Sequence, residues 1–343
     1  GGMSPGLSPS GRSTVAGSVP PPGAPGEPTL RSASKHQAKA QGRRKDKHQP
    51  RHKSKNHGKR KDKNHNTHRG RVTPTPTGTT ATLLAAGDIA GCSSSGDEAT
   101  AALLDGLDGT VVTLGDNVYD SGTASEFTSC YGPNWGRHTS RTRPAPGNHD
   151  YRTAGAAGYF GYFGTAAGDP TTGYYSYELG SWHIVALNSN CVQVGGCNAG
   201  SPQESWLRAD LAAHPTTCTL AYWHHPRFSF GNYGNDTATQ ALWQALYDHG
   251  AEIVLSGHDH NYQQYVPQTP SGTRDDARGI REFVVGTGGR GHYALRTPPS
   301  TVEAFNGDTY GILQLTLRPT GYDWQFVPVA GKSFTATGST ACH

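Results

Sequence analysis

Two apolar runs that each end in Gly-Asp constrain the fold more than any other feature of the sequence. Residues 82–86 (Thr-Leu-Leu-Ala-Ala) precede Gly87-Asp88, and residues 111–114 (Val-Val-Thr-Leu) precede Gly115-Asp116. Short apolar runs of this kind predict buried strands. Residues 97–107 predict a helix between them, because two acids stand in its first turn, where the helix dipole favours negative charge. Strand, helix and strand together predict a βαβ unit and an α/β fold with parallel strands.

The two carboxylates of this unit indicate a metal site. Asp88 and Asp116 follow parallel strands, whose carboxyl ends form the edge where open α/β sheets bind ligands. Neighbouring strands lie about 5 Å apart, so the two side chains can share one ion or bridge two. A buried carboxylate is costly unless positive charge meets it. Gly-Asp alone is also an ordinary turn, so the indication comes from the pair.

Three further predicted strands end in side chains that can bind metal ions. They are Asn148 with His149 after a short approach strand, His224 with His225 after residues 218–223, and His258 with His260 after residues 252–256. Alternate residues of an extended segment face the same way. We therefore expect both His258 and His260 to reach a shared site, but at most one of His224 and His225.

The donor types narrow the chemistry. Asn148 offers an amide oxygen, His149 can donate a proton, and Asp150 can orient the His149 ring. Oxygen and imidazole donors without cysteine favour Fe, Mn, Zn or Ni. His183, within the predicted strand 181–188, is expected to be a structural histidine and not a ligand.

The rest of the domain follows from periodicity. Apolar spacing predicts helices over residues 203–213 and 236–249, and strands at 283–285, 310–317 and 322–328. The Gly- and Tyr-rich residues 155–180 predict strand and turn packing, at an edge of the cleft.

Charge divides the chain in two. Residues 1–80 hold 17 Lys and Arg against three acids, a net charge of +14, whereas the remainder carries −10. The first part has few large apolar side chains, so we expect a disordered tail over 1–80 and a folded domain over 81–343. The basic run 35–71 is either a solvated linker or a contact for a polyanion such as nucleic acid, cell-wall polymer or anionic lipid. No run of about 20 apolar residues predicts a membrane span.

The six cysteines suggest three disulfides. None forms a Cys-x-x-Cys pair, and an even number in this domain suits an oxidising compartment. Cys191 and Cys197 enclose a short flexible loop that can close on itself. The remaining pairs would be Cys92–Cys130 and Cys218–Cys342. Six cysteines allow 15 connectivities, and buried free thiols are the alternative.

The order of these motifs resembles the calcineurin-like metallophosphoesterases. The motifs are Gly-Asp-x-Ala (87–90), Gly-Asp-Asn-x-Tyr (115–119), Gly-Asn-His-Asp (147–150), His-His-Pro (224–226) and Gly-His-Asp-His (257–260), within residues 82–330. Within this family the chain most resembles the purple acid phosphatases, because Tyr119 stands three residues after Asp116 and most metallophosphoesterases lack this tyrosine. The resemblance implies two mixed β-sheets packed as a sandwich, with helices on the outer faces.

The resemblance also implies a ligand set. Asp88, Asp116, Tyr119 and His260 would bind Fe(III), and Asp116, Asn148, His224 and His258 would bind Fe(II), Zn or Mn. His149 would be an outer-sphere acid or a hydrogen-bond donor to the transition state.

Two departures from the family pattern concern the first and fourth motifs. Ala90 stands where purple acid phosphatases commonly have Gly. Residues 226–240 lack a histidine that relatives often carry, so Tyr233 or His225 would have to replace it.

The function implied is hydrolysis of phosphate monoesters by attack of a metal-bound hydroxide, in an acid phosphatase-like enzyme. A phosphodiesterase or nucleotide-cleaving enzyme on the same metal site is the nearest alternative. A polyanion-binding envelope protein that acts through the basic tail is an alternative of another class. The cysteines and the resemblance favour an extracellular or cell-envelope location, although no apolar signal segment is visible at the N-terminus.

Overall fold

The computed structural model describes residues 78–216 and 218–343, and the fold is that of these residues. The predicted disordered tail and its basic run 35–71 lie outside this part, except for residues 78–80. No helix of the described residues is long and apolar enough to cross a bilayer.

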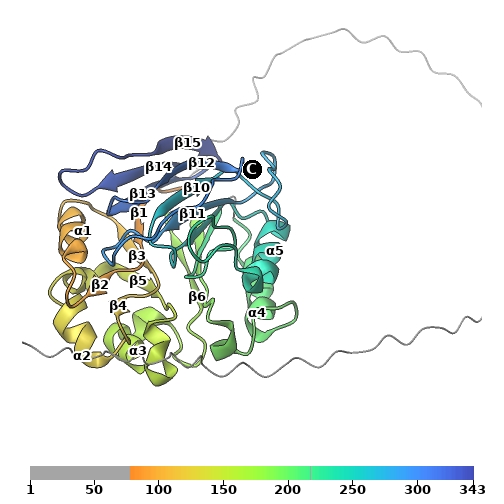
Figure 1. Ribbon diagram of the computed structural model, residues 1–343. Coiled ribbons are helices and arrows are strands. Elements are labelled where there is room, and N and C mark those ends of the chain that lie inside the picture. The colour runs from red at the N-terminus through yellow and green to blue at the C-terminus, as the bar shows by residue number, and fades with distance from the viewer. Residues whose placement is uncertain (1–77, 217) are drawn as a thin grey trace, which may run out of the picture. The chain divides into compact units, whose positions relative to one another are not determined.

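Two mixed β-sheets pack face to face, as predicted (Figure 1). One has six strands in the order β15-β14-β13-β1-β3-β5, and the other has seven in the order β12-β10-β11-β9-β8-β7-β6. Strands β1, β3 and β5 run parallel, as do β7, β8, β9 and β11, and the flanking strands are antiparallel. A small parallel pair, β2 and β4, lies beside them.

The strands and helices have the following bounds. The six-stranded sheet contains β1 Ala81–Ala86, β3 Thr110–Leu114, β5 Thr142–Ala145, β13 Gly311–Arg318, β14 Gly321–Pro328 and β15 Thr337–Ala341. The seven-stranded sheet contains β6 Tyr175–Leu179, β7 Trp182–Ala186, β8 Thr219–Tyr222, β9 Ile253–Ser256, β10 Tyr262–Tyr265, β11 Arg281–Val285 and β12 Val302–Asn306. The small pair is β2 Ala90–Gly91 and β4 Val118–Tyr119. The α-helices are α1 Gly96–Asp105, α2 Ala124–Glu126, α3 Ala157–Phe163, α4 Pro202–Ala213 and α5 Gln240–Asp248.

The predicted βαβ unit is present as β1, α1 and β3. Leu84 pairs with Val111 in the parallel ladder, so the two Gly-Asp motifs end adjacent strands. Helix α1 lies on the opposite side of the sheets from α4 and α5 (Figure 1). Helices therefore cover both outer faces of the sandwich.

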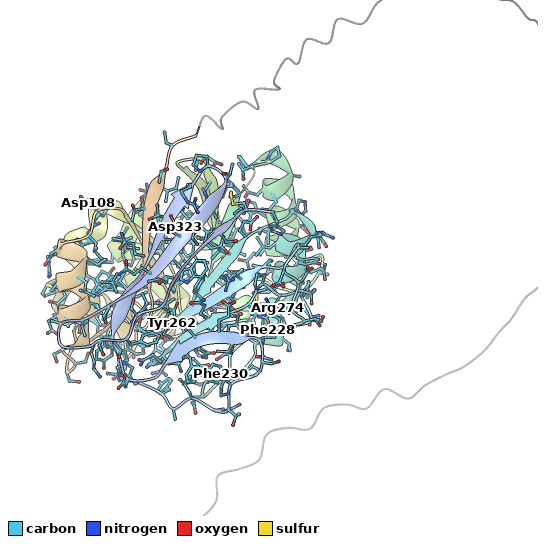
Figure 2. The ribbon with its side chains drawn as sticks, turned by 90° about the horizontal axis from the view of Figure 1, so that it is seen from above. Asp108, Phe228, Phe230, Tyr262, Arg274 and Asp323 are labelled. Atoms are coloured by element: carbon cyan, nitrogen blue, oxygen red, sulfur yellow. A yellow bond between two sulfur atoms is a disulfide. The ribbon has the colours of Figure 1, made fainter. Side chains whose placement is uncertain are left out.

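Alternating residues of β9 show where the core lies. Ile253 and Leu255 belong to the apolar cluster that contains residues of both sheets, whereas Val254 packs with residues of α4 and α5 on the outer face. In Figure 2, Tyr262 lies in the interior of the sandwich, and Asp108 and Arg274 lie at its periphery. A two-residue period of this kind places each strand between two packed layers.

The segment 155–180 differs in part from the prediction. Its second half forms the edge strand β6, but its first half forms the helix α3. Tyr159 and Phe163 stand four residues apart on that helix, and Phe163 packs against Phe127 at 5.8 Å between ring centroids. Aromatic packing outweighs the low helix propensity of the glycines.

All three predicted disulfides form: Cys92–Cys130, Cys191–Cys197 and Cys218–Cys342. No free cysteine remains, and all six cysteines lie in the described part of the chain.

Candidate metal centre

Loops from both sheets meet at one edge of the sandwich. The loop after β1 is joined to the seven-stranded sheet by Gly87 N, which donates to Val285 O at 2.9 Å. It is joined to the loop after β3 by Asp88 N, which donates to Gly115 O at 3.0 Å. Because these loops follow the carboxyl ends of parallel strands, the predicted site residues converge there.

One cluster of donor atoms surrounds the Tyr119 hydroxyl. It lies 2.9 Å from Asp88 Oδ1, 3.0 Å from Asp116 Oδ2 and 3.1 Å from His260 Nε2. Asp88, Asp116, Tyr119 and His260 are all buried. The ring nitrogen His260 Nδ1 donates to Gly291 O at 3.1 Å, which leaves the Nε2 lone pair directed into the cluster.

A second cluster surrounds His224 Nε2. That atom lies 3.1 Å from Asn148 Oδ1, 3.2 Å from His258 Nδ1 and 3.4 Å from Asp116 Oδ2. The opposite nitrogen, His224 Nδ1, donates to Leu114 O at 2.8 Å. Asp116 Oδ2 therefore lies in both clusters, at the position of a ligand shared by two ions.

The donor set fits two cations. Carboxylate, phenol, amide and imidazole donors converge from seven residues, and backbone carbonyls hold two of the imidazoles with a nitrogen free to coordinate. The residues Asp88, Asp116 and His224 present ligand atoms that all lie within 4.8 Å of one another.

The backbone adopts an unusual conformation at three of these residues. Asp88, Asp116 and His258 have φ of 59°, 48° and 68°. Asp and His are among the few non-glycine residues that accept this left-handed region, and such residues cluster at functional sites. Gly147 also permits a close approach, because a Cβ there would lie 2.1 Å from Asp116 N.

In the protein without bound ions, the ionisable side chains of the two clusters change one another's pKa values. Burial opposes ionisation of Asp116, but the charge of His224 outweighs it and lowers the pKa of Asp116 below its usual range. Burial acts against the charge of His224 as well, yet Asp116 raises its pKa to about 9. Burial and the His224 charge lower the pKa of His258 to about 2, and burial raises the pKa of Tyr119. A carboxylate and an imidazolium thus neutralise each other where cations would lie.

His149 lies at the rim of the first cluster. Its Nδ1 donates to Asp120 O at 2.7 Å, and its Nε2 lies 3.9 Å from Asp116 Oδ2. Its ring centroid is 4.4 Å from that of Tyr119. The Nε2 atom therefore faces the same space as the metal-ligand candidates.

Asp150 does not orient His149, contrary to our expectation. Its Oδ2 accepts from Gly147 N at 2.8 Å and from Asn117 Nδ2 at 3.0 Å, and the Asp120 carbonyl holds the His149 ring instead. Burial, and then the charge of Asp116, raise the pKa of Asp150 to about 7. This carboxyl group fixes the loop that carries Asn148.

His225 joins the second cluster, although we expected at most one of the two adjacent histidines there. Its ring centroid lies 4.5 Å from that of His258, and Ser189 Oγ lies 2.8 Å from its Nδ1. Strand β8 ends at Tyr222, so the alternation of an extended strand no longer applies. Burial, and then the charge of His224, lower the pKa of His225 to about 3.

His258 and His260 both reach the site as expected, but from a loop and not from a strand.

Two residues that lie beside the site, Arg290 and Tyr293, were not predicted from the sequence. The Arg290 guanidinium lies 4.8 Å from the Tyr119 ring centroid and 2.8 Å from Asp120 Oδ1. The Tyr293 ring stacks on His260 at 3.9 Å. Both stand in an irregular segment without periodicity, so no sequence signal indicated them. Tyr233, expected as a substitute for a missing histidine, stacks on His258 at 4.1 Å.

Comparison with known proteins agrees with this geometry. The family model of the calcineurin-like phosphoesterases matches residues 81–262. Purple acid phosphatase 15 of Arabidopsis thaliana is 27% identical over an alignment of 191 residues, which covers 45% of this chain and 35% of that protein. The chain thus spans about a third of the length of this curated relative.

Solved structures show the same fold. A purple acid phosphatase from yellow lupin (Lupinus luteus) seeds matches 76% of this chain and 53% of its own, with a TM-score of 0.57 and 16% identity. GAP50, described as the anchor in the inner membrane complex of Plasmodium, matches 77% of this chain and 89% of its own, with a TM-score of 0.57 and 12% identity. Since the family match covers more than half of the sequence, the chain belongs to the calcineurin-like phosphoesterase family, within which it resembles the purple acid phosphatases.

Proposed function

We propose that the protein is a dinuclear-metal phosphatase that hydrolyses phosphate monoesters. The observation that carries this proposal is the position of the Tyr119 hydroxyl, within 3.1 Å of donor atoms of Asp88, Asp116 and His260. These four residues would hold Fe(III), because a phenolate is a hard anionic donor that suits a trivalent ion. Asp116, Asn148, His224 and His258 would hold Fe(II), Zn or Mn. The three disulfides support an extracellular or cell-envelope location as part of the same proposal.

Bound ions would supply Lewis acidity and an activated water. The chain's own contribution at the rim is His149. The Asp120 carbonyl accepts its Nδ1 proton, so Nε2 can carry or give up a proton toward a bound ester. Its 17% exposed side chain leaves room for a leaving group on the solvent side. We therefore propose His149 as the group that protonates or stabilises the leaving oxygen.

His225 is a weaker candidate for an acid. Its low pKa keeps the ring neutral through the acidic range, and its Nδ1 faces Ser189. We propose that His225 orients the second cluster and that Tyr233, 53% exposed above His258, is the group open to substrate.

Metal analysis and a visible spectrum test the metal centre. We expect two metal ions per chain, and a visible charge-transfer band from ferric iron and tyrosinate. Tyr119→Phe should remove that band. Tyr162→Phe is the matched control, because it changes a tyrosine that packs against Phe127 in the aromatic cluster. Iron bound with no such band in the unaltered protein would contradict the assignment of Tyr119.

Activity on matched esters tests the reaction. We expect faster hydrolysis of 4-nitrophenyl phosphate than of bis(4-nitrophenyl) phosphate. His149→Ala should retain both metals and lose turnover. The reverse substrate preference would favour a phosphodiesterase on the same centre, and full turnover by His149→Ala would disprove the role of that histidine.

A further inference from the structure

A cavity opens directly beside the second cluster. It has a volume of about 390 Å³, and its lining includes the metal-ligand candidate Asn148. Tyr151, Arg152, Asn190, Val192 and Gln193 complete most of the wall. A cavity of this size is in the range that holds a small organic molecule.

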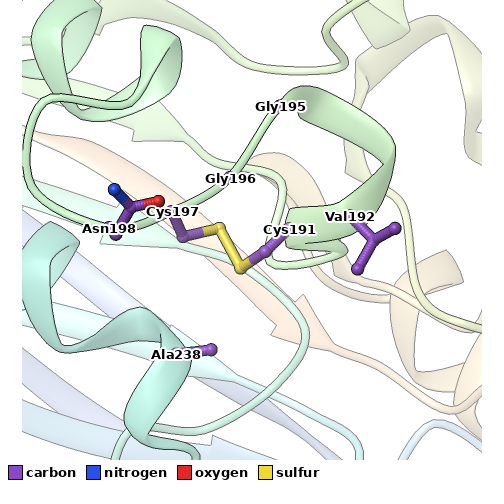
Figure 3. Close-up of a pocket in the computed structure, with 7 residues that line it drawn as sticks. All are labelled: Cys191, Val192, Gly195, Gly196, Cys197, Asn198 and Ala238. Atoms are coloured by element: carbon purple, nitrogen blue, oxygen red, sulfur yellow. A yellow bond between two sulfur atoms is a disulfide. The ribbon is translucent and has the colours of Figure 1, made fainter. Parts of the chain in front are cut away.

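The disulfide-closed loop Cys191–Cys197 forms one wall of this cavity. Figure 3 shows the bond between the two cysteines at the base of the loop, with Val192 on the turn that projects from it. Cys191 and Val192 of this loop also line a neighbouring cavity of about 350 Å³, so the loop borders both cavities. The side chain of Val192 is 93% exposed, more than any other large apolar side chain of the described residues.

Arg152 gives the wall of this cavity a positive charge. Its Nη1 donates to Asp120 O at 3.1 Å, the same carbonyl that accepts from His149 Nδ1. The nearby Arg290 is paired with the Asp120 carboxylate at 2.8 Å. Over residues 78–216 and 218–343, Arg152 forms no ion pair within 4.0 Å. Its exposed guanidinium therefore adds uncompensated charge beside the proposed leaving-group acid.

We propose that this cavity binds the leaving group of the substrate and that Arg152 selects leaving groups that carry a second negative charge. The substrate class is then a phosphate monoester with a further phosphate or carboxylate, such as a sugar bisphosphate. This inference rests on the proposed phosphatase function. The phosphoryl group would lie at the two clusters, the ester oxygen near His149, and the anionic end against the guanidinium, which can donate two hydrogen bonds to it.

Two nitrophenyl esters that differ by one carboxylate test the inference. We measure kcat and KM for 4-nitrophenyl phosphate and for 3-carboxy-4-nitrophenyl phosphate, using the full chain. The specificity ratio is kcat/KM for the carboxylated ester divided by that for the plain ester. Arg152→Gln should lower this ratio about tenfold, which equals about 1.4 kcal/mol of transition-state binding. We expect the change in KM for the carboxylated ester, and Arg152→Lys should restore most of the ratio.

Arg296→Gln is the matched control. Arg296 is an exposed arginine that also donates to a backbone carbonyl beside the site, from Nη2 to Asn232 O at 2.7 Å, but it does not line this cavity. It should leave the ratio unchanged. An equal fall of the ratio in both variants would refute a specific contact, since it would reflect charge alone. A ratio that Arg152→Gln leaves unchanged, with both esters hydrolysed, would refute the inference and retain the phosphatase. Hydrolysis of neither ester would contradict the proposed function, and this inference with it.

Discussion

Replacement of His183 tests how a buried imidazolium stabilises the domain away from the metal centre. His183 lies on β7 and is 1% exposed. Its Nδ1 lies 2.7 Å from Glu178 Oε1, and its Nε2 lies 2.7 Å from Asp210 Oδ2. Since ionised carboxylates only accept, both ring nitrogens donate and the ring is charged. Burial opposes that charge, but the hydrogen bonds to Asp210 and Glu178 outweigh it and raise the pKa of His183.

The expected size of the effect follows from the two contacts. Asp210 is 8% exposed, so its charged hydrogen bond contributes about 1.5–3 kcal/mol. Glu178 is 50% exposed, and solvent screening limits its pair to about 1 kcal/mol or less. His183→Ala should therefore lower the free energy of unfolding by about 3 kcal/mol, close to the range for a broken buried pair.

The pH dependence has a definite sign. The pKa of His183 is higher in the folded than in the unfolded state, so its contribution is complete below the unfolded value of about 6.5. The contribution is lost as the pH rises through the folded value. The difference between the unaltered protein and His183→Ala should be largest at about pH 5.5 and clearly smaller at about pH 9.

Urea unfolding at the two pH values measures this difference. His249→Ala is the control, because His249 follows helix α5 and its Nδ1 donates to the carbonyl of Ala245, with no carboxylate of the described residues within ion-pair distance. It should show only a small loss of stability. An equal loss for His183→Ala at both pH values, or a larger one at the higher pH, would refute the charged state of His183.

Two further predictions concern covalent and steric features of the domain. The Cys218–Cys342 disulfide closes a loop of 124 residues, so by loop-closure entropy its removal should lower the free energy of unfolding by about 4.9 kcal/mol. The Cys191–Cys197 disulfide closes a loop of six residues, and its removal should lower this free energy by about 2.2 kcal/mol. Urea unfolding of the two double Ser variants measures both losses, and equal losses would contradict the entropic account. Gly147→Ala should displace Asp116 and abolish metal binding. Gly161→Ala is the control, because nothing in the described part of the chain lies within 4 Å of an added Cβ there. This variant should bind metal normally and gain up to about 1 kcal/mol of stability. Metal analysis and thermal unfolding check both variants, and full metal content in Gly147→Ala would disprove the close contact.

The sequence predicted the βαβ unit, helices α4 and α5 and the convergence of the strand ends, because these depend on local periodicity and on the direction of parallel strands. It did not predict helix α3, since aromatic contacts with the distant Phe127 stabilise that segment. It also did not predict how Asp150 and His225 are oriented. Their orientations depend on loop backbone beyond the strands, where the alternation of side chains ends. Arg290 and Tyr293 are brought to the site by tertiary packing alone.

The disulfide Cys218–Cys342 has a consequence for how the domain presents its metal centre. Cys218 immediately precedes β8, so the bond holds residue 342 at the amino ends of the parallel strands. The start of β1 lies at the same edge, and an added Cβ at Gly78 would lie 3.1 Å from Pro319. Both ends of the described domain therefore lie at the edge opposite the metal centre. A surface or fusion partner attached at either end would therefore lie away from the edge that carries the metal centre. Both ends are suitable for oriented immobilisation for this reason.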